Sequence, residues 1–276
     1  TSARDLFTGG FVQSPYDRAA FLSWIPEDGS HWNNQPNCNI RGFEAAASTT
    51  NCRYGITMNN ENDTTTEATM ILGPRFEDAL AYAAGLHARQ MRKGSSIPYV
   101  SHLIAVCSLV LEAGGDEDMA IAALLHDAVE DQGGLSRLEE IGERYGERVA
   151  GMVDACTDSY DTPKPPWRER KEAYLAAVAD KSMDAMLVSC ADKLHNARCI
   201  LSDYRRVGDE LWARFNADKD GVLWYYESLA QTFAQKAERA QSEGDYSKAV
   251  SPEGFLWLAG ELQRTVCELK ENSEGG

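Results

Sequence analysis

The sequence contains no apolar run that approaches ~18 residues, the length at which a transmembrane helix is expected. It also shows no sustained alternation of polar and apolar residues, the pattern typical of a β-strand with one buried face. The first residues, Thr1 to Arg4, lead into no apolar signal segment and include no initiator Met, so we expect a processed or trimmed start. These absences disfavour a membrane protein and a β-rich fold.

No Cys-x-x-Cys pair occurs among the seven cysteines, which argues against zinc or redox chemistry at such a pair. Cys38 and Cys52 lie in an irregular N-terminal stretch, and a disulfide between them is left open. Because the pattern is not that of a disulfide scaffold, we expect a cytoplasmic location. The remaining cysteines fall in helix-like patterns, where a reduced and buried thiol is expected: Cys107, Cys156, Cys190, Cys199 and Cys267.

Positive charge is scarce, with 27 basic against 43 acidic residues and a formal net charge of −16. Such a surface repels nucleic acid and anionic membranes, so neither is an expected partner. It also repels a free polyphosphate nucleotide. A substrate of that kind would therefore need a local basic patch and a bound cation.

The chain changes character at Gly73. Residues 1–72 are rich in Asn, Thr, Ser and Gly and keep no helical period, so we expect an irregular segment of unknown role. After it, apolar residues recur at intervals of three and four, which predicts a succession of amphipathic helices. We predict an all-α fold, with a main domain over residues 73–235 and a helical extension over residues 236–276.

The segment 121–131 concentrates ionisable side chains. Placed on one continuous helix, its apolar residues share one side, and His126, Asp127, Glu130 and Asp131 spread across the other. Three carboxylates and an imidazole in six residues are unfavourable unless a cation neutralises them. The alternative is a solvated, acidic helix end beside a glycine turn.

Two further segments carry related residue types. Asp192 and Asn196 are i, i+4 neighbours on the polar face of a predicted helix, and a proline-led turn places His102 at a helix start. Each alone is compatible with an ordinary surface helix or a structural histidine. Together with His126 and Asp127 they supply a mixed nitrogen and oxygen donor set suited to Mn²⁺, Fe²⁺ or Zn²⁺.

In order and spacing, three segments resemble the HD-domain alarmone hydrolases: Pro98–His102, Ala122–Asp131 and Ala191–Asn196. That family comprises the hydrolase half of the bifunctional alarmone synthetase–hydrolases and the small stand-alone hydrolases. The resemblance covers about Arg75 to Phe233. It implies an HD-domain helical bundle that removes the 3′-pyrophosphate from ppGpp or pppGpp, giving GDP or GTP and pyrophosphate.

Residue by residue, the resemblance implies the following site. One Mn²⁺, with Fe²⁺ or Zn²⁺ as alternatives, would be held by His102, His126, Asp127 and Asp192. Glu130 and Asp131 would orient and deprotonate the attacking water. Arg92 and Lys93 would flank the base and its phosphates, Asn196 would contact the sugar, and Tyr225 would lie near the nucleotide.

Some nearby residues receive other expectations. Arg89, Arg92 and Lys93 form the local basic patch that the acidic surface makes necessary. His87 continues an apolar stripe and is expected to be a packed core histidine, whereas His195 faces between the apolar and polar sides of its helix and is left out of the site. The sequence after the HD region is too short for a synthetase domain, so we expect hydrolysis without synthesis.

Two alternatives remain open. An HD phosphohydrolase acting on the adenosine analogue of the alarmone, or on another 2′- or 3′-phosphorylated nucleotide, would have the same metal site and a different base pocket. A non-catalytic alarmone-binding or partner protein would keep the fold but lose metal ligands or one residue of the acidic pair Glu130 and Asp131. The presence of every implied ligand, and of both Glu130 and Asp131, favours an enzyme. Oligomeric state is left open.

Overall fold

The computed structural model describes residues 72–158, 160, 163, 165–178, 180–243, 250 and 252–275. These residues all belong to one of the chain's two units, residues 56–276. The expected irregular segment over residues 1–72 lies outside this range except for Leu72, as do Cys38 and Cys52. The expected domain boundaries stay predictions. Helix α9 is continuous across the boundary that was expected after residue 235.

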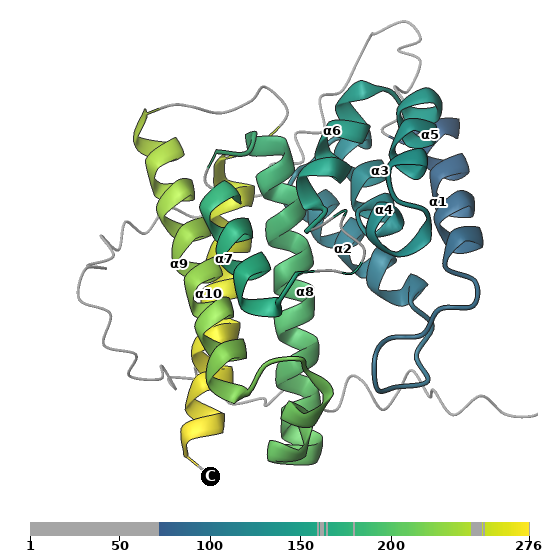
Figure 1. Ribbon diagram of the computed structural model, residues 1–276. Helices are drawn as coiled ribbons and strands as arrows, with labels where there is room; N and C mark the ends of the chain where they lie inside the picture. Colours follow the sequence, from purple (N-terminus) through teal and green to yellow (C-terminus); the bar gives the residue numbers. More distant parts are fainter. Residues whose placement is uncertain are drawn as a thin grey trace, which may run out of the picture. The chain divides into compact units, whose positions relative to one another are not determined.

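The described residues confirm the all-α prediction (Figure 1). Their one β-type pairing is an isolated bridge between Met91 and Pro98. Within this part of the chain, no helix has the length and apolar character needed to cross a membrane. The helices are α1 (Pro74–Leu86), α2 (Val100–Glu112), α3 (Glu117–Leu125), α4 (Ala128–Gln132), α5 (Leu135–Tyr145), α6 (Glu147–Cys156), α7 (Trp167–Val178), α8 (Met183–Val207), the 3-10 helix η2 (Gly208–Arg214), α9 (Lys219–Glu243) and α10 (Pro252–Glu274).

Helix α3 lies at the centre of the first group of helices. It contacts α1, α2, α6 and α8, and every side chain from Met119 to Leu125 is buried. A helix that is apolar on all sides must be covered by other elements, which explains its position. The side chain of Asp116 accepts a hydrogen bond from the backbone N–H of Met119 and so caps its N-terminus.

Helix α8 joins this group to the C-terminal helices. It contacts α2, α3 and α6 through one side, and α9 and α10 through another. Figure 1 shows α8 between two groups of helices. Helices α9 and α10 lie on one side of it, and the helices that surround α3 lie on the other. Ser182 caps its N-terminus by accepting from the backbone N–H of Ala185. Because α8 crosses the interior, a polar residue on it, such as Asp192, can be buried among functional groups.

Helix α10 approaches α2 closely at Gly254. A Cβ at this position would overlap the backbone carbonyl of Ala113, at the C-terminus of α2. Only glycine lets the two backbones come this near without a shift. The first turn of α10 is thereby fixed against the end of α2.

The predicted continuous helix over residues 121–131 is wrong. Helix α3 ends at Leu125 and α4 begins at Ala128, with His126 and Asp127 in the turn between them. The ring Nδ1 of His126 lies 2.7 Å from the carbonyl oxygen of Ala123, which in an uninterrupted helix would accept the N–H of Asp127. The break directs the His126 and Asp127 side chains toward α2 and α8, with which they make contacts described below.

The cysteine expectation is confirmed in part. Cys107, Cys156 and Cys190 are free and buried within helices, whereas Cys199 and Cys267 are only half-buried. Burial raises the pKa of the Cys190 thiol, which keeps it protonated and unreactive.

Candidate metal centre and nucleotide cavity

Four side chains from three parts of the fold converge on one point. His102 comes from α2, His126 and Asp127 from the turn after α3, and Asp192 from α8. One ligand atom of each of His102, His126 and Asp127 lies within 4.8 Å of the others. Asp127 Oδ2 is 3.5 Å from His102 Nε2 and 3.0 Å from His126 Nε2. Asp192 Oδ1 is 3.2 Å and 3.6 Å from the same two nitrogens.

The hydrogen bonds of the two imidazoles suit metal binding. Because the Ala123 carbonyl can only accept, His126 Nδ1 must donate to it, which leaves the Nε2 lone pair available. His126 Nε2 is buried and has no hydrogen-bond partner. A buried nitrogen in this state is unfavourable unless a ligand reaches it, so the residues present fit a metal ion.

His195 fixes the second imidazole. Its Nδ1 lies 2.7 Å from Nδ1 of His102, so one of the two nitrogens must donate to the other. Burial, with the charges of His102 and Arg92, lowers the pKa of His195 to about 4, and a neutral His195 can accept at Nδ1. His102 then donates from Nδ1 and keeps its Nε2 lone pair free for a metal.

The electrostatics of the cluster also call for a cation. Burial alone would raise the carboxyl pKa of Asp127 and Asp192, but their cationic neighbours lower it well below the usual value. Burial would lower the pKa of His126, yet the two carboxylates outweigh it and raise the pKa well above 6.5. The two carboxylates therefore favour positive charge at this point. A divalent cation can supply that charge.

Further groups orient the carboxylates. The Tyr99 hydroxyl donates to Asp127 Oδ2 at 2.6 Å, and its ring stacks on His87 with centroids 5.2 Å apart. Lys193 Nζ donates to Asp192 Oδ2 at 2.6 Å. The remaining oxygen of Asp192, Oδ1, accepts from Asn196 Nδ2 at 2.5 Å. Such partners hold metal-ligand side chains in one orientation.

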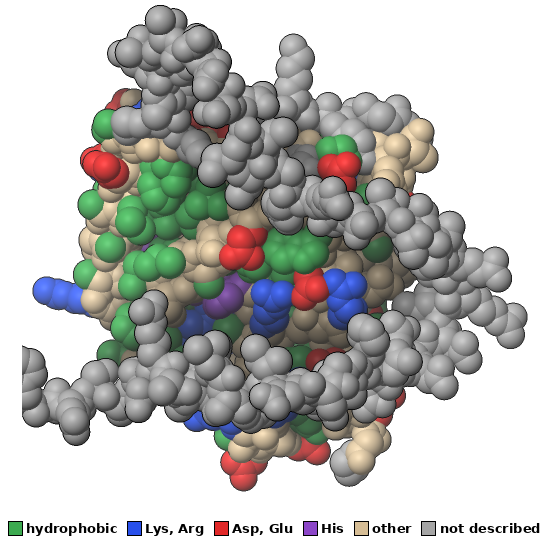
Figure 2. All heavy atoms as spheres, turned by 180° about the vertical axis from the view of Figure 1, so that it is seen from behind, with side chains coloured by type: hydrophobic (Ala, Val, Ile, Leu, Met, Phe, Trp, Pro, Cys, Tyr) green, Lys and Arg blue, Asp and Glu red, His purple; other side chains and the backbone are tan. Residues whose placement is uncertain are grey.

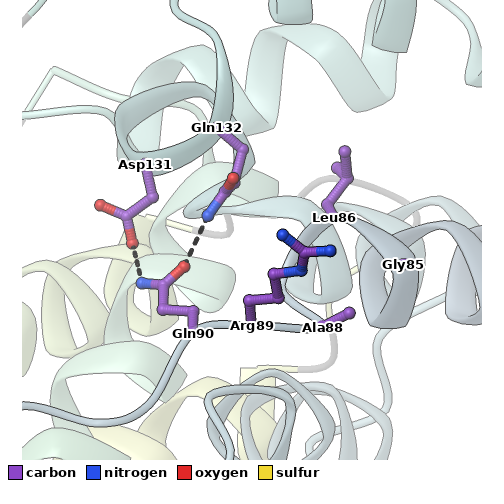
Figure 3. Close-up of a pocket in the computed structure, with 7 residues that line it drawn as sticks. All are labelled: Gly85, Leu86, Ala88, Arg89, Gln90, Asp131 and Gln132. Atoms are coloured by element: carbon purple, nitrogen blue, oxygen red, sulfur yellow. Dashed lines mark hydrogen bonds between the residues drawn. The ribbon is translucent and has the colours of Figure 1, made fainter.

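Glu130 and Asp131 lie on α4, directly after the ligand-bearing turn. Gln90 Nε2 donates to Asp131 Oδ2 at 2.6 Å, and Gln132 Nε2 donates to Gln90 Oε1 at 2.7 Å (Figure 3). Partial burial raises the carboxyl pKa of Asp131, and the negative charges of Asp127 and Glu130 raise it further, against the Gln90 hydrogen bond. A general base is most effective when its pKa lies near the working pH, so a raised pKa makes this carboxylate a better base near neutral pH.

The predicted basic patch is divided between two cavities. Arg89 lines a cavity of about 520 Å³ beside Gln90 and Asp131, shown in Figure 3. Arg92 and Lys93 instead line a second cavity of about 770 Å³, together with Asn196 and His195. We call this second one the nucleotide cavity, after the ligand proposed for it below. Figure 2 shows that cationic side chains gather next to a histidine across the middle of one face, although the chain is acidic.

The nucleotide cavity lies beside the metal centre. Three of its lining residues, Tyr99, His195 and Asn196, each hydrogen-bond to one of the four converging side chains. Asn196 Oδ1 also accepts from Arg92 Nη2 at 2.9 Å. The other terminal nitrogen of Arg92, Nη1, is buried without a hydrogen-bond partner and is thus available to a ligand.

Tyr225 and Tyr226 differ in position. Tyr225 is buried against Trp167, with centroids 5.9 Å apart, and does not line the nucleotide cavity. Its neighbour Tyr226 does line it. Successive residues on a helix point about 100° apart, and the sequence alone does not show which of them faces the cavity.

Tyr99 and His195, which were not among the predicted site residues, contact two of the converging side chains. A signal existed for His195, because it follows Asp192 by three positions and so lies on the same face of α8. No comparable pattern singles out Tyr99, whose contact with Asp127 depends on the turn before α2. The predicted burial of His87 is confirmed at 2% exposure.

Comparisons with known proteins agree with this geometry. A family model described as the HD domain matches residues 79–223. The chain is 37% identical over 139 residues to the guanosine-3′,5′-bis(diphosphate) 3′-pyrophosphohydrolase MESH1 of Xenopus tropicalis, covering 49% of this chain and 73% of that protein. Its identity to the human protein of that name is 34% over 157 residues, covering 56% and 80%.

A solved structure agrees as well. It is that of a metazoan ortholog of SpoT that hydrolyzes ppGpp, and it superposes with a TM-score of 0.52 at 27% identity. The match covers 70% of this chain and 95% of that one. The buried histidine and aspartate group is consistent with the metal site of such a domain. The chain therefore belongs to the HD-domain family and is a phosphohydrolase-type member related to ppGpp hydrolases.

Proposed function

We propose that this protein hydrolyses the 3′-pyrophosphate of guanosine polyphosphate alarmones, giving GDP or GTP and pyrophosphate, with Mn²⁺ as cofactor. The observation that carries the proposal is that the candidate metal centre lies beside a cavity with cationic walls, three lining residues of which hydrogen-bond to the converging side chains. The relatives named for 3′-pyrophosphate hydrolysis of guanosine 3′,5′-bis(diphosphate) support the choice of substrate.

The cation would be held by His102, His126, Asp127 and Asp192. When bound, it supplies Lewis-acid polarisation of the phosphate and of the attacking water. Two imidazoles and two carboxylates leave the donor set short of six ligands, so positions remain for water and substrate.

Glu130 and Asp131 would accept the proton of the attacking water. Both lie on α4, whose first residue directly follows the ligand Asp127. Gln90 fixes the Asp131 carboxylate through one oxygen and leaves the other available. A positioned general base of this kind contributes roughly 10²–10⁴ to the rate.

Arg92, Lys93 and Asn196 would bind the nucleotide. Asn196 joins Asp192 to Arg92 through its two amide atoms, so a nucleotide held by Arg92 is aligned with the metal ligands. The unpartnered Arg92 Nη1 can donate to a phosphate or to a base carbonyl. Tyr225 stays a proposed contact that would require movement, since it is buried away from the cavity.

The test is a product analysis. Purified protein is incubated with ppGpp, pppGpp and the adenosine analogue, with Mn²⁺ or with chelator, and products are resolved by ion-exchange chromatography. We expect Mn²⁺-dependent release of pyrophosphate together with GDP or GTP. Cleavage of the adenosine compound alone would keep the reaction and change the substrate. Absence of any turnover with metal bound would contradict the proposal and favour a non-catalytic role.

A further inference from the structure

The nucleotide cavity continues along α8 from His195 to Arg206 and ends beside η2. At that end it is lined by Arg198, Arg206 and Arg214, which we call the arginine end. Nothing in the sequence patterns singled these residues out. Arg92 and Lys93 line the cavity nearer to the metal ligands, and Asp203 is the acidic residue of the lining, so the walls carry an excess of positive charge.

The arginine end is held together by Asp203. Its Oδ2 lies 2.9 Å from Arg214 Nη1, and its Oδ1 lies 3.5 Å from Arg206 Nη1. Arg198 contacts Glu261 of α10 at 2.8 Å. A guanidinium has five N–H donors, so an arginine that contacts one carboxylate keeps donors for an anionic ligand.

The loop before α2 also shapes this end. Gly94 adopts a φ of +73°, and a Cβ there would lie 2.9 Å from Arg214 Cδ and 3.2 Å from its Nε. Glycine thus allows the arginine stem to pass along the loop that carries Arg92 and Lys93. The side chain of Arg214 is 31% exposed, compared with 72% for Arg206. Arg214 is therefore the more buried and the more firmly positioned of the two side chains.

The metal centre and the arginine end are far enough apart for two separate phosphate groups. At a rise of 1.5 Å per residue, Arg198 lies about 9 Å and Asp203 about 16 Å along α8 from the metal ligand Asp192. The nucleotide substrate of the proposed function carries one phosphate chain on the 3′ carbon of its ribose and another on the 5′ carbon. A nucleotide with its 3′-diphosphate at the metal centre would direct the other chain away from it.

We propose that the arginine end binds the 5′-phosphates of the nucleotide and makes the site selective for the length of that chain. This inference rests on the proposed function. Binding then strengthens from a 5′-monophosphate to a diphosphate and a triphosphate, because each added phosphate brings charge toward Arg206 and Arg214. The metal centre takes no part in this selection.

The test measures binding without turnover. Guanosine 3′-diphosphates with one, two or three 5′-phosphates are titrated into chelator-treated protein by isothermal calorimetry. We expect the triphosphate form to bind about tenfold more tightly than the monophosphate form, as charge-assisted hydrogen bonds at a partly exposed site allow. Arg206→Gln and Arg214→Gln are each expected to reduce that ratio toward one, mainly by weakening binding of the triphosphate form.

Arg205→Gln is the matched control. It changes the same residue type on the same helix, and Arg205 contacts Glu268 of α10 and does not line the cavity. Its binding ratio should equal that of the wild type, and circular dichroism checks that all three variants are folded. Equal affinity for the three nucleotides in the wild type, absence of binding, or an unchanged ratio in both cavity variants would overturn the proposal.

Failure of the proposed function has a different signature. If Mn²⁺-loaded protein hydrolyses none of the three nucleotides, the hydrolase proposal is wrong. The ratio of the affinities for the triphosphate and monophosphate forms still decides whether the arginine end distinguishes the length of the 5′-phosphate chain. If hydrolysis occurs and the two affinities are equal, the proposed hydrolase function stands, and the proposed selectivity for the length of the 5′-phosphate chain is wrong.

Discussion

At the residue scale, the site depends on hydrogen bonds that set the state of each ligand. His126 is fixed by the backbone carbonyl of Ala123 in the preceding helix, whereas His102 is fixed by the side chain of His195 on α8. The first arrangement is local and robust to substitution elsewhere. The second depends on a single side chain of α8, so it can be tested by mutation.

Replacing His195 should weaken metal binding. His195→Leu removes the acceptor for His102 Nδ1, and losing such a partner lowers metal affinity by roughly 10–100-fold. His195→Asn should retain much of the affinity, because its amide oxygen can accept in place of Nδ1. Isothermal titration with Mn²⁺ measures both. Equal affinity in the Leu variant and the wild type would show that His195 does not orient His102.

Replacing Glu130 should separate chemistry from metal binding. We expect Glu130→Gln to reduce turnover of ppGpp by about 10²–10⁴, the contribution of a positioned general base, while Mn²⁺ affinity changes little. Glu139→Gln, an exposed position on the neighbouring helix α5, serves as the control. Full activity in Glu130→Gln would assign proton transfer to Asp131 alone or to another group.

At the element scale, the fold brings α2, the α3–α4 turn and α8 to one point, and α10 packs against α8. Helix α10 also packs closely on the end of α2, where Gly254 contacts Ala113. Gly260 lies in the same helix, and a Cβ there would meet only the flexible end of Arg264, at 3.4 Å. The two glycines therefore respond to the same substitution in opposite directions.

Gly254→Ala should destabilise the protein by about 1–3 kcal/mol, because the added methyl forces the two backbones apart. Gly260→Ala should be neutral or stabilising by up to about 1 kcal/mol, since alanine is the better helix former. Urea denaturation followed by circular dichroism gives both values. Similar effects of the two substitutions would contradict the described contact between α10 and α2.

An ion-pair cluster attaches α7 to the segment after α6. Asp158 is largely buried and contacts Arg170 at 2.6 Å and Lys171 at 2.5 Å. Burial would raise its carboxyl pKa, but Lys171 and Arg170 outweigh burial and lower it. A carboxyl with a lowered pKa in the folded state contributes stability above its unfolded pKa, and that contribution is lost as the pH falls through the folded pKa.

Asp158→Asn should therefore cost about 3 kcal/mol at pH 7, where two buried cations lose their partner. The difference from the wild type should shrink below about pH 4, the range in which an unperturbed Asp titrates. Glu172→Gln removes an exposed pair with Arg168 and should change stability by less than about 1 kcal/mol. A mutational cost that stays constant from pH 7 to pH 3 would contradict the assigned pKa direction.

At the scale of the whole molecule, the all-α fold could be predicted from the sequence because its helices have a clear apolar period. The helix break at His126 and Asp127 could not be predicted, because it comes from a side-chain hydrogen bond that no periodicity records. Adjacent acidic and imidazole side chains, with the family resemblance, were enough to name four candidate metal ligands. These four residues do converge in the structure.

The walls of the nucleotide cavity were harder to predict. Arg198 and Arg206 line it from α8, and Arg214 joins them because η2 follows α8 and returns Arg214 to Asp203. Tyr226 rather than its neighbour Tyr225 lines the cavity, because α9 is rotated so that Tyr225 packs on Trp167. Both features depend on how helices pack together, which spacing within one helix does not specify.

The most direct test of the central claim is a metal titration of activity. Chelator-treated protein receives increasing Mn²⁺, and bound metal and pyrophosphate release from ppGpp are measured in the same samples. We expect hydrolysis to rise with bound metal and to saturate at one equivalent per chain, and we expect Asp192→Ala neither to retain the metal nor to turn over substrate. Hydrolysis that is undiminished without metal, or in Asp192→Ala, would contradict metal-dependent catalysis at this site.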